Sequence, residues 1–232
     1  MTDSINLGGI VPGWSARAAP SGATAEGRYA RLEKLDAPRH AASLWDAVKG
    51  ADHIWDFLGY GPFASQQTFK DWIAERASLT DPLYYAVVDR PTGLPLGCVT
   101  LMEIRPTMGV AEVGHIFFSP LLQKTPAATE AVYLAAKIVF DDLGYRRFEW
   151  KCTDLNDPSI FAALRFGFTF EGVFRQHLVI KGRNRDTARY SMLDTEWPAR
   201  KAAFEAWLSP ENFDAAGQQK RALSQMNGVG SS

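Results

Sequence analysis

A strand that leads through a tight turn into a long helix is the feature that most constrains this chain. The apolar run Val110–Phe118 is followed by a Gln-x-x-Pro-x-Ala turn at Gln123–Ala128, which opens a predicted helix over Pro126–Leu143. The next run, Arg147–Cys152, alternates apolar and charged residues and predicts a second strand beside the first. Because strands and helices interleave after a meander of earlier strands, we predict a mixed α/β sheet.

Size and charge narrow the class of protein. The 232 residues suit one domain with terminal extensions: an expected flexible N-terminal arm over 1–27, a folded domain over 28–208 and a loose C-terminal tail over 209–232. The net charge of −1 argues against a nucleic-acid partner, since dedicated binders carry a basic excess. The sequence contains no membrane-length apolar run and no signal-peptide pattern, so we expect a cytoplasmic protein with no membrane partner.

The two cysteines, Cys98 and Cys152, each lie in an apolar, strand-like run. We interpret them as buried, unreactive thiols in a reducing compartment. A disulfide between them stays open, because the sequence does not give their separation.

The turn before the long helix is a candidate phosphate site. Backbone N–H groups at the start of a helix, together with its positive dipole end, suit a diphosphate. Small side chains would let phosphate oxygens approach the backbone, and Lys124 adds one positive charge. An ordinary strand-to-helix turn explains the same pattern equally well. The predicted phosphate-binding residues are Gln123, Lys124, Thr125, Ala127, Ala128 and Thr129.

Further residues carry a family resemblance over about 28–193. They are Thr129-Glu130-Ala131, Leu143-Gly144, Arg147, Asn156, Ser159, Arg165, Gly167-Phe168 and Glu171-Gly172. With this spacing the chain resembles the GNAT superfamily of acetyltransferases, and is most similar to its ribosomal-protein-alanine N-acetyltransferase type. The resemblance implies a single GNAT-like α/β domain, with a mostly antiparallel mixed sheet whose central strands splay apart between flanking helices.

The activity implied by this resemblance is direct acetyl transfer from acetyl-CoA, as co-substrate and without a metal, to a primary amine. A protein N-terminus and a small-molecule amine both remain open as acceptors. The pantetheine arm of CoA would lie between the two predicted strands, against the backbone of Phe117 and Phe118. Asn156 would bind the pantetheine or position Ser159, and Ser159 would protonate the departing thiolate or bind CoA. Helix capping is the structural alternative for Ser159.

Glu112 is the candidate general base, because its position matches the base glutamate of the histone-acetylating members of the superfamily. Only about one amine in a thousand is neutral at pH 7, so a base is useful and typically contributes about 10²–10⁴-fold. A carboxylate in a strand-edge salt bridge is the equal alternative. His115 and His177 are weaker candidates for the same role.

The chain departs from the family pattern at three positions. Pro126 replaces a usual glycine of the phosphate turn and removes one N–H donor. Ala163 stands where many members place a tyrosine that acts as general acid. Leu178 stands where the ribosomal-protein type can carry a glutamate. These departures motivate an alternative function, a degenerate CoA-binding module with a regulatory or structural role. Acyl transfer to a hydroxyl also stays open.

Two segments are expected to contact the acceptor. One is the aromatic loop Trp55–Phe63, for which a packed loop is the structural alternative, and the other is the predicted hairpin over Lys181–Arg189. The basic residues of this hairpin could also meet the CoA 3′-phosphate, an acidic substrate or a second subunit, and a homodimer stays open. These basic residues are Lys181, Arg183, Arg185 and Arg189.

Overall fold

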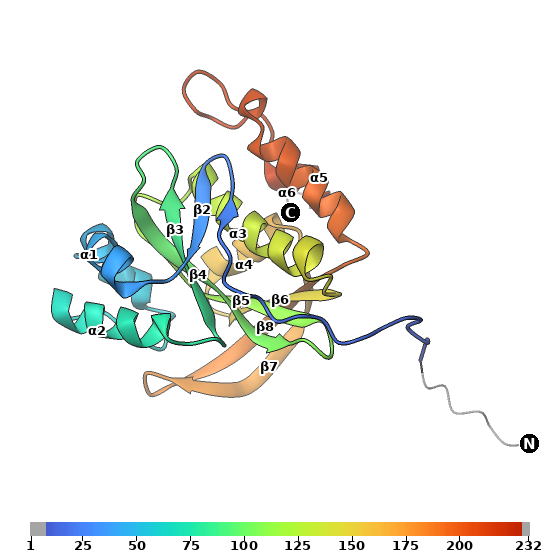
Figure 1. Cartoon of the computed structure of the whole chain (residues 1–232), viewed down its shortest axis with the longest axis horizontal. Coiled ribbons are helices and arrows are strands. Elements are labelled where there is room, and N and C mark those ends of the chain that lie inside the picture. Colours follow the sequence, from blue (N-terminus) through green and yellow to red (C-terminus); the bar gives the residue numbers. More distant parts are fainter. Residues whose placement is uncertain (1–7, 229–232) are drawn as a thin grey trace, which may run out of the picture.

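A computed structural model describes residues 8–228, which form one eight-stranded sheet with helices on both faces (Figure 1). The strand order is β1-β2-β3-β4-β5-β6-β8-β7, and the pair β5–β6 is the parallel one. The strands are β1 (Ala25–Glu26), β2 (Ala30–Lys34), β3 (Leu83–Asp89), β4 (Pro95–Arg105), β5 (Val110–Phe118), β6 (Arg147–Thr153), β7 (Thr169–Ile180) and β8 (Arg183–Leu193). The helices are α1 (Ala37–Val48), α2 (Gln66–Ala77), α3 (Pro126–Lys137), α4 (Asp157–Arg165), α5 (Trp197–Leu208) and α6 (Leu223–Met226). The single α/β domain and its mostly antiparallel mixed sheet are thus confirmed.

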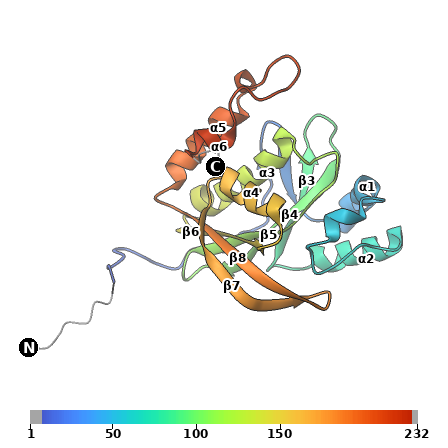
Figure 2. The same ribbon diagram turned by 180° about the vertical axis from the view of Figure 1, so that it is seen from behind.

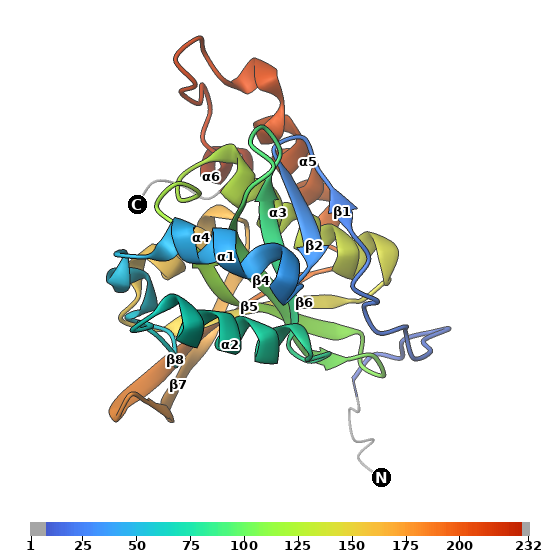
Figure 3. The same cartoon turned by 60° about the vertical axis from the view of Figure 1, so that its left-hand side comes forward.

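Alternation along the strands gives the sheet two separate hydrophobic cores. Ala111 and Val113 of β5 belong to the larger core, on the face that α3, α4 and α5 cover. Cys98 and Phe117 belong to a smaller aromatic core beneath α1 and α2, which lie in front of the sheet in Figure 3. Glu112, between Ala111 and Val113, therefore projects to the α1–α2 face.

The two central strands part along their length. The parallel pairing of β5 with β6 runs from Val110 opposite Arg147 to Val113 opposite Trp150 and then stops. Beyond this point β5 stays paired with β4, and β6 stays paired with β8. The β4–β5 register shifts next to His115, whose backbone φ of 45° marks a bulge. Because a bulge bends its strand, β5 turns away from β6, and the splayed strands expected from the family resemblance are present.

The long central helix begins where the sequence predicts. Thr125 is the N-cap of α3 and Pro126 is its first residue, a position that tolerates the missing N–H. The helix continues after Lys137 as a π-helical segment over Ile138–Asp142, so the predicted span Pro126–Leu143 is helical almost throughout. The tight junction fixes the start of α3 next to the open end of β5.

The last two strands form a long hairpin that reaches across the molecule (Figure 2). Strand β8 begins at Arg183, where Arg183 and Arg185 pair with Ile180 and Leu178. Near the tip, Lys181 Nζ donates a 2.9 Å hydrogen bond to the carbonyl of Trp55. The hairpin and the aromatic loop, both expected to contact the acceptor, therefore lie against each other.

The segments near both ends also contact the domain. Tyr145 Oη donates a hydrogen bond to the carbonyl of Ala18, and Trp14 lies under the guanidinium groups of Arg17 and Arg146. In the segment 209–228, expected as a loose tail, Leu223 is fully buried in the larger core. The chain thus stays packed beyond 208. Residues 1–7 and 229–232, the remainder of the predicted arm and tail, lie outside the described residues.

Candidate functional site

Strands β5 and β6 leave a gap between them where their pairing ends. Glu112 lies at the apex of this gap, one residue before the last pair. Its side chain is almost completely buried, and within residues 8–228 neither carboxylate oxygen has a hydrogen-bond partner. Lys151 Nζ forms an ion pair with Oε1 at 3.1 Å, and Arg189 Nη1 lies 3.8 Å from Oε2. Burial raises the pKa of Glu112, while Lys151 and Arg189 partly oppose this rise. The residue therefore lies in the ion-pair environment that the salt-bridge alternative requires, and Oε2, whose cation is more distant, is the oxygen better able to accept a proton.

Aromatic side chains enclose the same side of the gap. His115 stacks on Tyr84, and its Nδ1 lies 3.2 Å from Tyr60 Oη. Burial is the main cause that lowers the pKa of His115 to about 4, so its imidazole is neutral at pH 7. Of the aromatic loop, Trp55 is buried in the smaller core against Phe117, while Tyr60 reaches the gap. The loop thus supplies both a packed core residue and a wall of the candidate site.

His177, the other candidate base, also projects toward this region. The β7–β8 register shifts between Phe174 and Leu178, where Gln176 adopts a positive φ of 49°. His177 Nδ1 then lies 3.0 Å from Thr187 Oγ1, on the face of β8 that also carries Arg189. Burial, followed by nearby Arg189, Lys151 and Arg185, lowers the pKa of His177. His177 lies on the β7–β8 hairpin itself, and its side chain is exposed, whereas that of Glu112 is buried.

The other face of the gap presents the predicted acid. Ser159 Oγ accepts a 3.1 Å hydrogen bond from Trp150 Nε1, which leaves the hydroxyl proton able to donate. Asn156 caps α4, since its Oδ1 accepts a 3.2 Å bond from the backbone N–H of Ser159. Burial raises the pKa of the Cys152 thiol, and the adjacent Ser159 hydroxyl opposes this rise. Ser159 therefore keeps a donor, while Asn156 is both the cap of α4 and a positioning residue for Ser159.

Most of the backbone amides in the turn before α3 already have hydrogen-bond partners in the protein. Thr125 Oγ1 accepts a 3.2 Å bond from Ala128 N, and the Thr129 amide donates to the Thr125 carbonyl. Four of the predicted phosphate-binding amides are already used within the turn: Gln123, Thr125, Ala128 and Thr129. In the described part of the chain, the amides of Lys124 and Ala127 keep no such partner. A diphosphate would meet these two donors and the Lys124 ammonium.

The turn also fixes the end of β5. Gln123 Nε2 donates a 2.9 Å hydrogen bond to the Phe118 carbonyl, which joins two residues predicted to bind CoA. Phe117 is buried in the smaller core, and Phe118 packs against the larger one. The backbone of these two residues thus forms the β5 wall of the gap, held rigid on both faces of the sheet.

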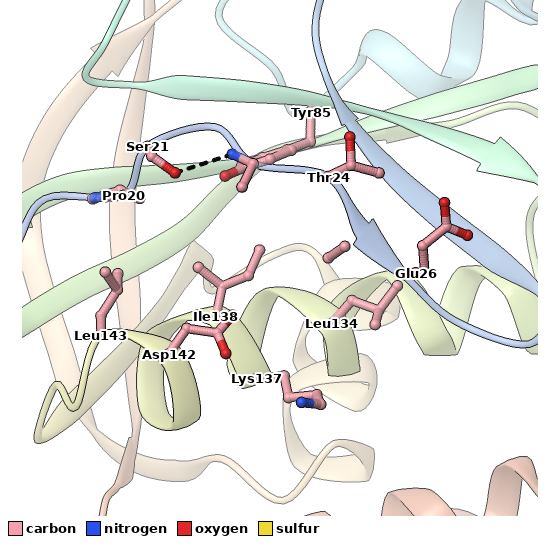
Figure 4. A pocket seen from close by; sticks show the side chains of 12 residues that line it. Pro20, Ser21, Thr24, Glu26, Tyr85, Leu134, Lys137, Ile138, Asp142 and Leu143 are labelled. Atoms are coloured by element: carbon pink, nitrogen blue, oxygen red, sulfur yellow. Dashed lines mark hydrogen bonds between the residues drawn. The ribbon is translucent and has the colours of Figure 1, made fainter.

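Two hollows on the surface lie away from the candidate site residues described above. One, of about 380 Å³, lies between the N-terminal arm and the end of α3, where Leu134, Lys137 and Asp142 line it (Figure 4). The other is a shallow depression of about 680 Å³ on the hairpin, beside Arg175 and Asp186. Neither contains Glu112 or Ser159. We therefore locate the candidate site by the parted strands and the chemistry of the side chains around them.

Comparison with known proteins agrees with this geometry. A family profile described as the acetyltransferase (GNAT) domain matches residues 31–169, more than half of the chain. The chain belongs to the GNAT acetyltransferase family. Family membership favours an acetyltransferase over the non-catalytic module, and implies acetyl-CoA as the co-substrate. No group of side chains in residues 8–228 has the composition of a metal site, and no described helix is long and apolar enough to cross a membrane.

Solved GNAT structures resemble the chain closely. A GCN5-related N-acetyltransferase from Brucella melitensis is 49% identical, with a TM-score of 0.92 over 94% of this chain and 100% of that one. A probable acetyltransferase of the GNAT family from Chromobacterium violaceum is 42% identical, with a TM-score of 0.78 over 83% and 96%. The ribosomal L7/L12 alpha-N-protein acetyltransferase RimL shares the fold, with 20% identity and a TM-score of 0.64 over 74% and 94%. No protein of curated function matches the chain.

Two site features were not predicted from the sequence. Lys151 is one of the charged residues of the predicted strand Arg147–Cys152 and has no predicted role, yet it lies on the same face of the sheet as Glu112. Its alternation with Cys152 and Glu149 was the available signal, because residues two apart share one face of a strand. The Trp150–Ser159 hydrogen bond had no such signal, since it depends on how α4 packs on the sheet.

Proposed function

We propose that this protein transfers the acetyl group of acetyl-CoA to a primary amine, with Glu112 as general base and Ser159 as general acid. One observation carries the proposal: a buried carboxylate without hydrogen bonds and a serine hydroxyl lie on opposite sides of the gap between β5 and β6. The gap joins the two faces of the sheet. An acyl donor from the α3–α4 side and an amine from the hairpin side can therefore meet within it.

The residues of this chain fit the co-substrate. The unpaired edge of β5 over Gly114–Phe118 offers main-chain groups to the amides of a pantetheine arm, as an added strand would. Asn156 is placed to bind the same arm, while the free amides of Lys124 and Ala127 suit the diphosphate. We assign CoA binding to this path.

The reaction needs one proton to leave the amine and one to reach the thiolate. The amine nitrogen forms a C–N bond to the acetyl carbon, and the C–S bond breaks. Glu112 takes the amine proton, and its raised pKa brings it closer to neutral pH, where a base works best. Ser159 donates its hydroxyl proton to the leaving sulfur and regains one from solvent. A backbone N–H of the β5 edge stabilises the charge that develops on the carbonyl oxygen. The products are an N-acetyl amine and CoA.

The proposal is tested by release of free thiol from acetyl-CoA with a panel of peptide N-termini and small amines. Calorimetric titration with CoA runs in parallel, and mass spectrometry confirms the acetylated product. We expect amine-dependent thiol release and product together with CoA binding. CoA binding without turnover on any amine would contradict the proposal and favour the non-catalytic module. Product formed on a hydroxyl would contradict the assignment of an amine acceptor.

A further inference from the structure

Arg185 is a half-buried cation without a carboxylate partner. It lies on β8 opposite Leu178, and its Nε is buried without a hydrogen-bond partner. Within the described chain, no acidic side chain lies within salt-bridge distance of its guanidinium. The neighbouring Asp186 is already used, since it accepts from the backbone N–H of Gln176 and from Asn184 Nδ2. A partly desolvated guanidinium without an anion is costly, which makes Arg185 a candidate for binding an anion from outside the chain.

The strand geometry places Arg185 on the acceptor side of the gap. Along β8, Arg185, Thr187 and Arg189 share one face, and Arg189 on that face lies next to Glu112. Thr187 pairs with Thr153, the last residue of β6, so Arg185 lies just beyond the end of that strand, where the gap is open. Burial lowers the pKa of Arg185, which Cys152 and then Glu112 partly oppose.

The two other cations near Glu112, Lys151 and Arg189, already have acidic or aromatic partners. Arg185 differs from them because it has no such partner in the described chain. Lys151 lies 3.1 Å from Glu112 and 3.8 Å from Glu103. Arg189 lies 3.8 Å from Glu112 and packs over the ring of Phe174. Ala127 and Ala128 at the start of α3 belong to the larger core, on the sheet face opposite Glu112, so we take the CoA diphosphate to be a different anion from the one that Arg185 meets.

We propose that Arg185 binds an anionic group, a carboxylate or a phosphate, that the amine acceptor itself carries. This inference rests on the proposed N-acetyltransferase function and specifies its substrate class. The anion would lie against the guanidinium at the hairpin, and the amine of the same molecule would extend to Glu112. Amines that carry only positive charge would find no partner at Arg185 and would be disfavoured.

The test compares matched acceptors with the full-length protein. Peptides that begin with Asp or Glu are paired with otherwise identical ones that begin with Asn or Gln, and O-phosphoethanolamine is paired with ethanolamine. We expect kcat/KM to favour the anionic member of a pair by about ten- to hundredfold, the size of a charge-assisted hydrogen bond. The peptide and phosphate pairs distinguish the two sources of the anion, and a preference in either pair supports the proposal.

Arg185→Gln should remove this preference mainly through KM for the anionic acceptors, with kcat and CoA affinity little changed. Arg183→Gln, an exposed arginine on the same hairpin, is the matched control and should leave the preference intact. If Arg185→Gln fails to fold, Arg185→Lys keeps a charge and should weaken the preference without reversing it. Equal rates within both pairs, an equal loss on neutral acceptors, or a loss of CoA affinity in Arg185→Gln would overturn the inference. Because such enzymes would still acetylate amines, these outcomes differ from failure of the proposed function, in which no amine is acetylated.

Discussion

Two buried glutamates, one at the start of the central helix and one at the apex of the strand gap, have opposite environments. Glu130 accepts hydrogen bonds of 2.5 to 2.8 Å from the backbone N–H groups of Arg28, Tyr29 and Ala30. Glu112 is equally buried but has no hydrogen-bond partner in the described chain. A buried carboxylate with all its hydrogen bonds made holds structure together, whereas a buried carboxylate held only by ion pairs is a candidate for chemistry. The difference separates a structural acid from a reactive one.

The largest effect is expected for Glu112→Gln. The amide keeps the shape of the side chain but cannot take a proton, so turnover should fall by about 10²–10⁴-fold. CoA affinity should change little, and thermal stability should fall, because Lys151 and Arg189 lose their partly buried anionic partner. Steady-state rates, calorimetry and a melting curve of the same preparation measure all three. A variant with wild-type turnover at every pH would remove Glu112 from the mechanism.

Glu130→Ala is the counterpart at the structural site. It leaves three N–H groups without an acceptor, two of them partly buried, so the free energy of unfolding should fall by about 3 kcal/mol. Denaturant unfolding followed by circular dichroism measures the loss. Glu130→Gln, which keeps one acceptor oxygen, should lose less. If Glu130→Ala were as stable as the wild type while Glu112→Gln unfolded, the contrast between the two glutamates would be reversed.

Lys151→Met should move the acidic limb of the pH–rate profile to higher pH. The Lys151 ammonium lowers the pKa of Glu112, so its removal lets burial raise that pKa further. Because the base must be deprotonated, the activity that is lost as pH falls should then be lost at a higher pH. Lys151→Arg keeps the charge and serves as the control. An acidic limb that does not move, or moves to lower pH, would show that it reports another group.

The smallest effect is expected for Pro126→Gly at the phosphate turn. The substitution restores a backbone N–H beside the free amides of Lys124 and Ala127, which should tighten CoA binding by up to about tenfold. Added backbone freedom offsets part of this gain, so an equal affinity also fits. Calorimetric titration of both proteins with CoA measures the change. A marked loss of affinity would mean that the proline holds the turn in its binding conformation.

The sequence predicted the elements around the gap better than their contacts. Val110–Phe118 and Pro126 were placed correctly because apolar runs and a helix-starting proline are local signals. The parting of the strands followed from the family resemblance rather than from any local pattern. The use of the Ala128 amide by Thr125 was not foreseen, because capping depends on the side-chain rotamer.

Tertiary packing explains the remaining differences. Leu223 is fully buried and Phe213 and Met226 pack against the same core, yet a loose tail was predicted because these apolar residues follow no helix or strand period. The sequence predicts a basic hairpin over Lys181–Arg189, but only its register with β7 shows that Arg185 belongs to a strand facing the gap. Local sequence patterns do not show which distant segments pair. The charged neighbours of Glu112 could therefore be identified only from the structure.

A crystal structure of the protein with CoA tests the central claim most directly. The account predicts that the pantetheine arm lies between Gly114–Phe118 of β5 and Lys151–Thr153 of β6. The thiol should then lie between Glu112 on one side and Ser159 on the other. CoA bound at another surface, or an arm that leaves the gap between these strands closed, would contradict it.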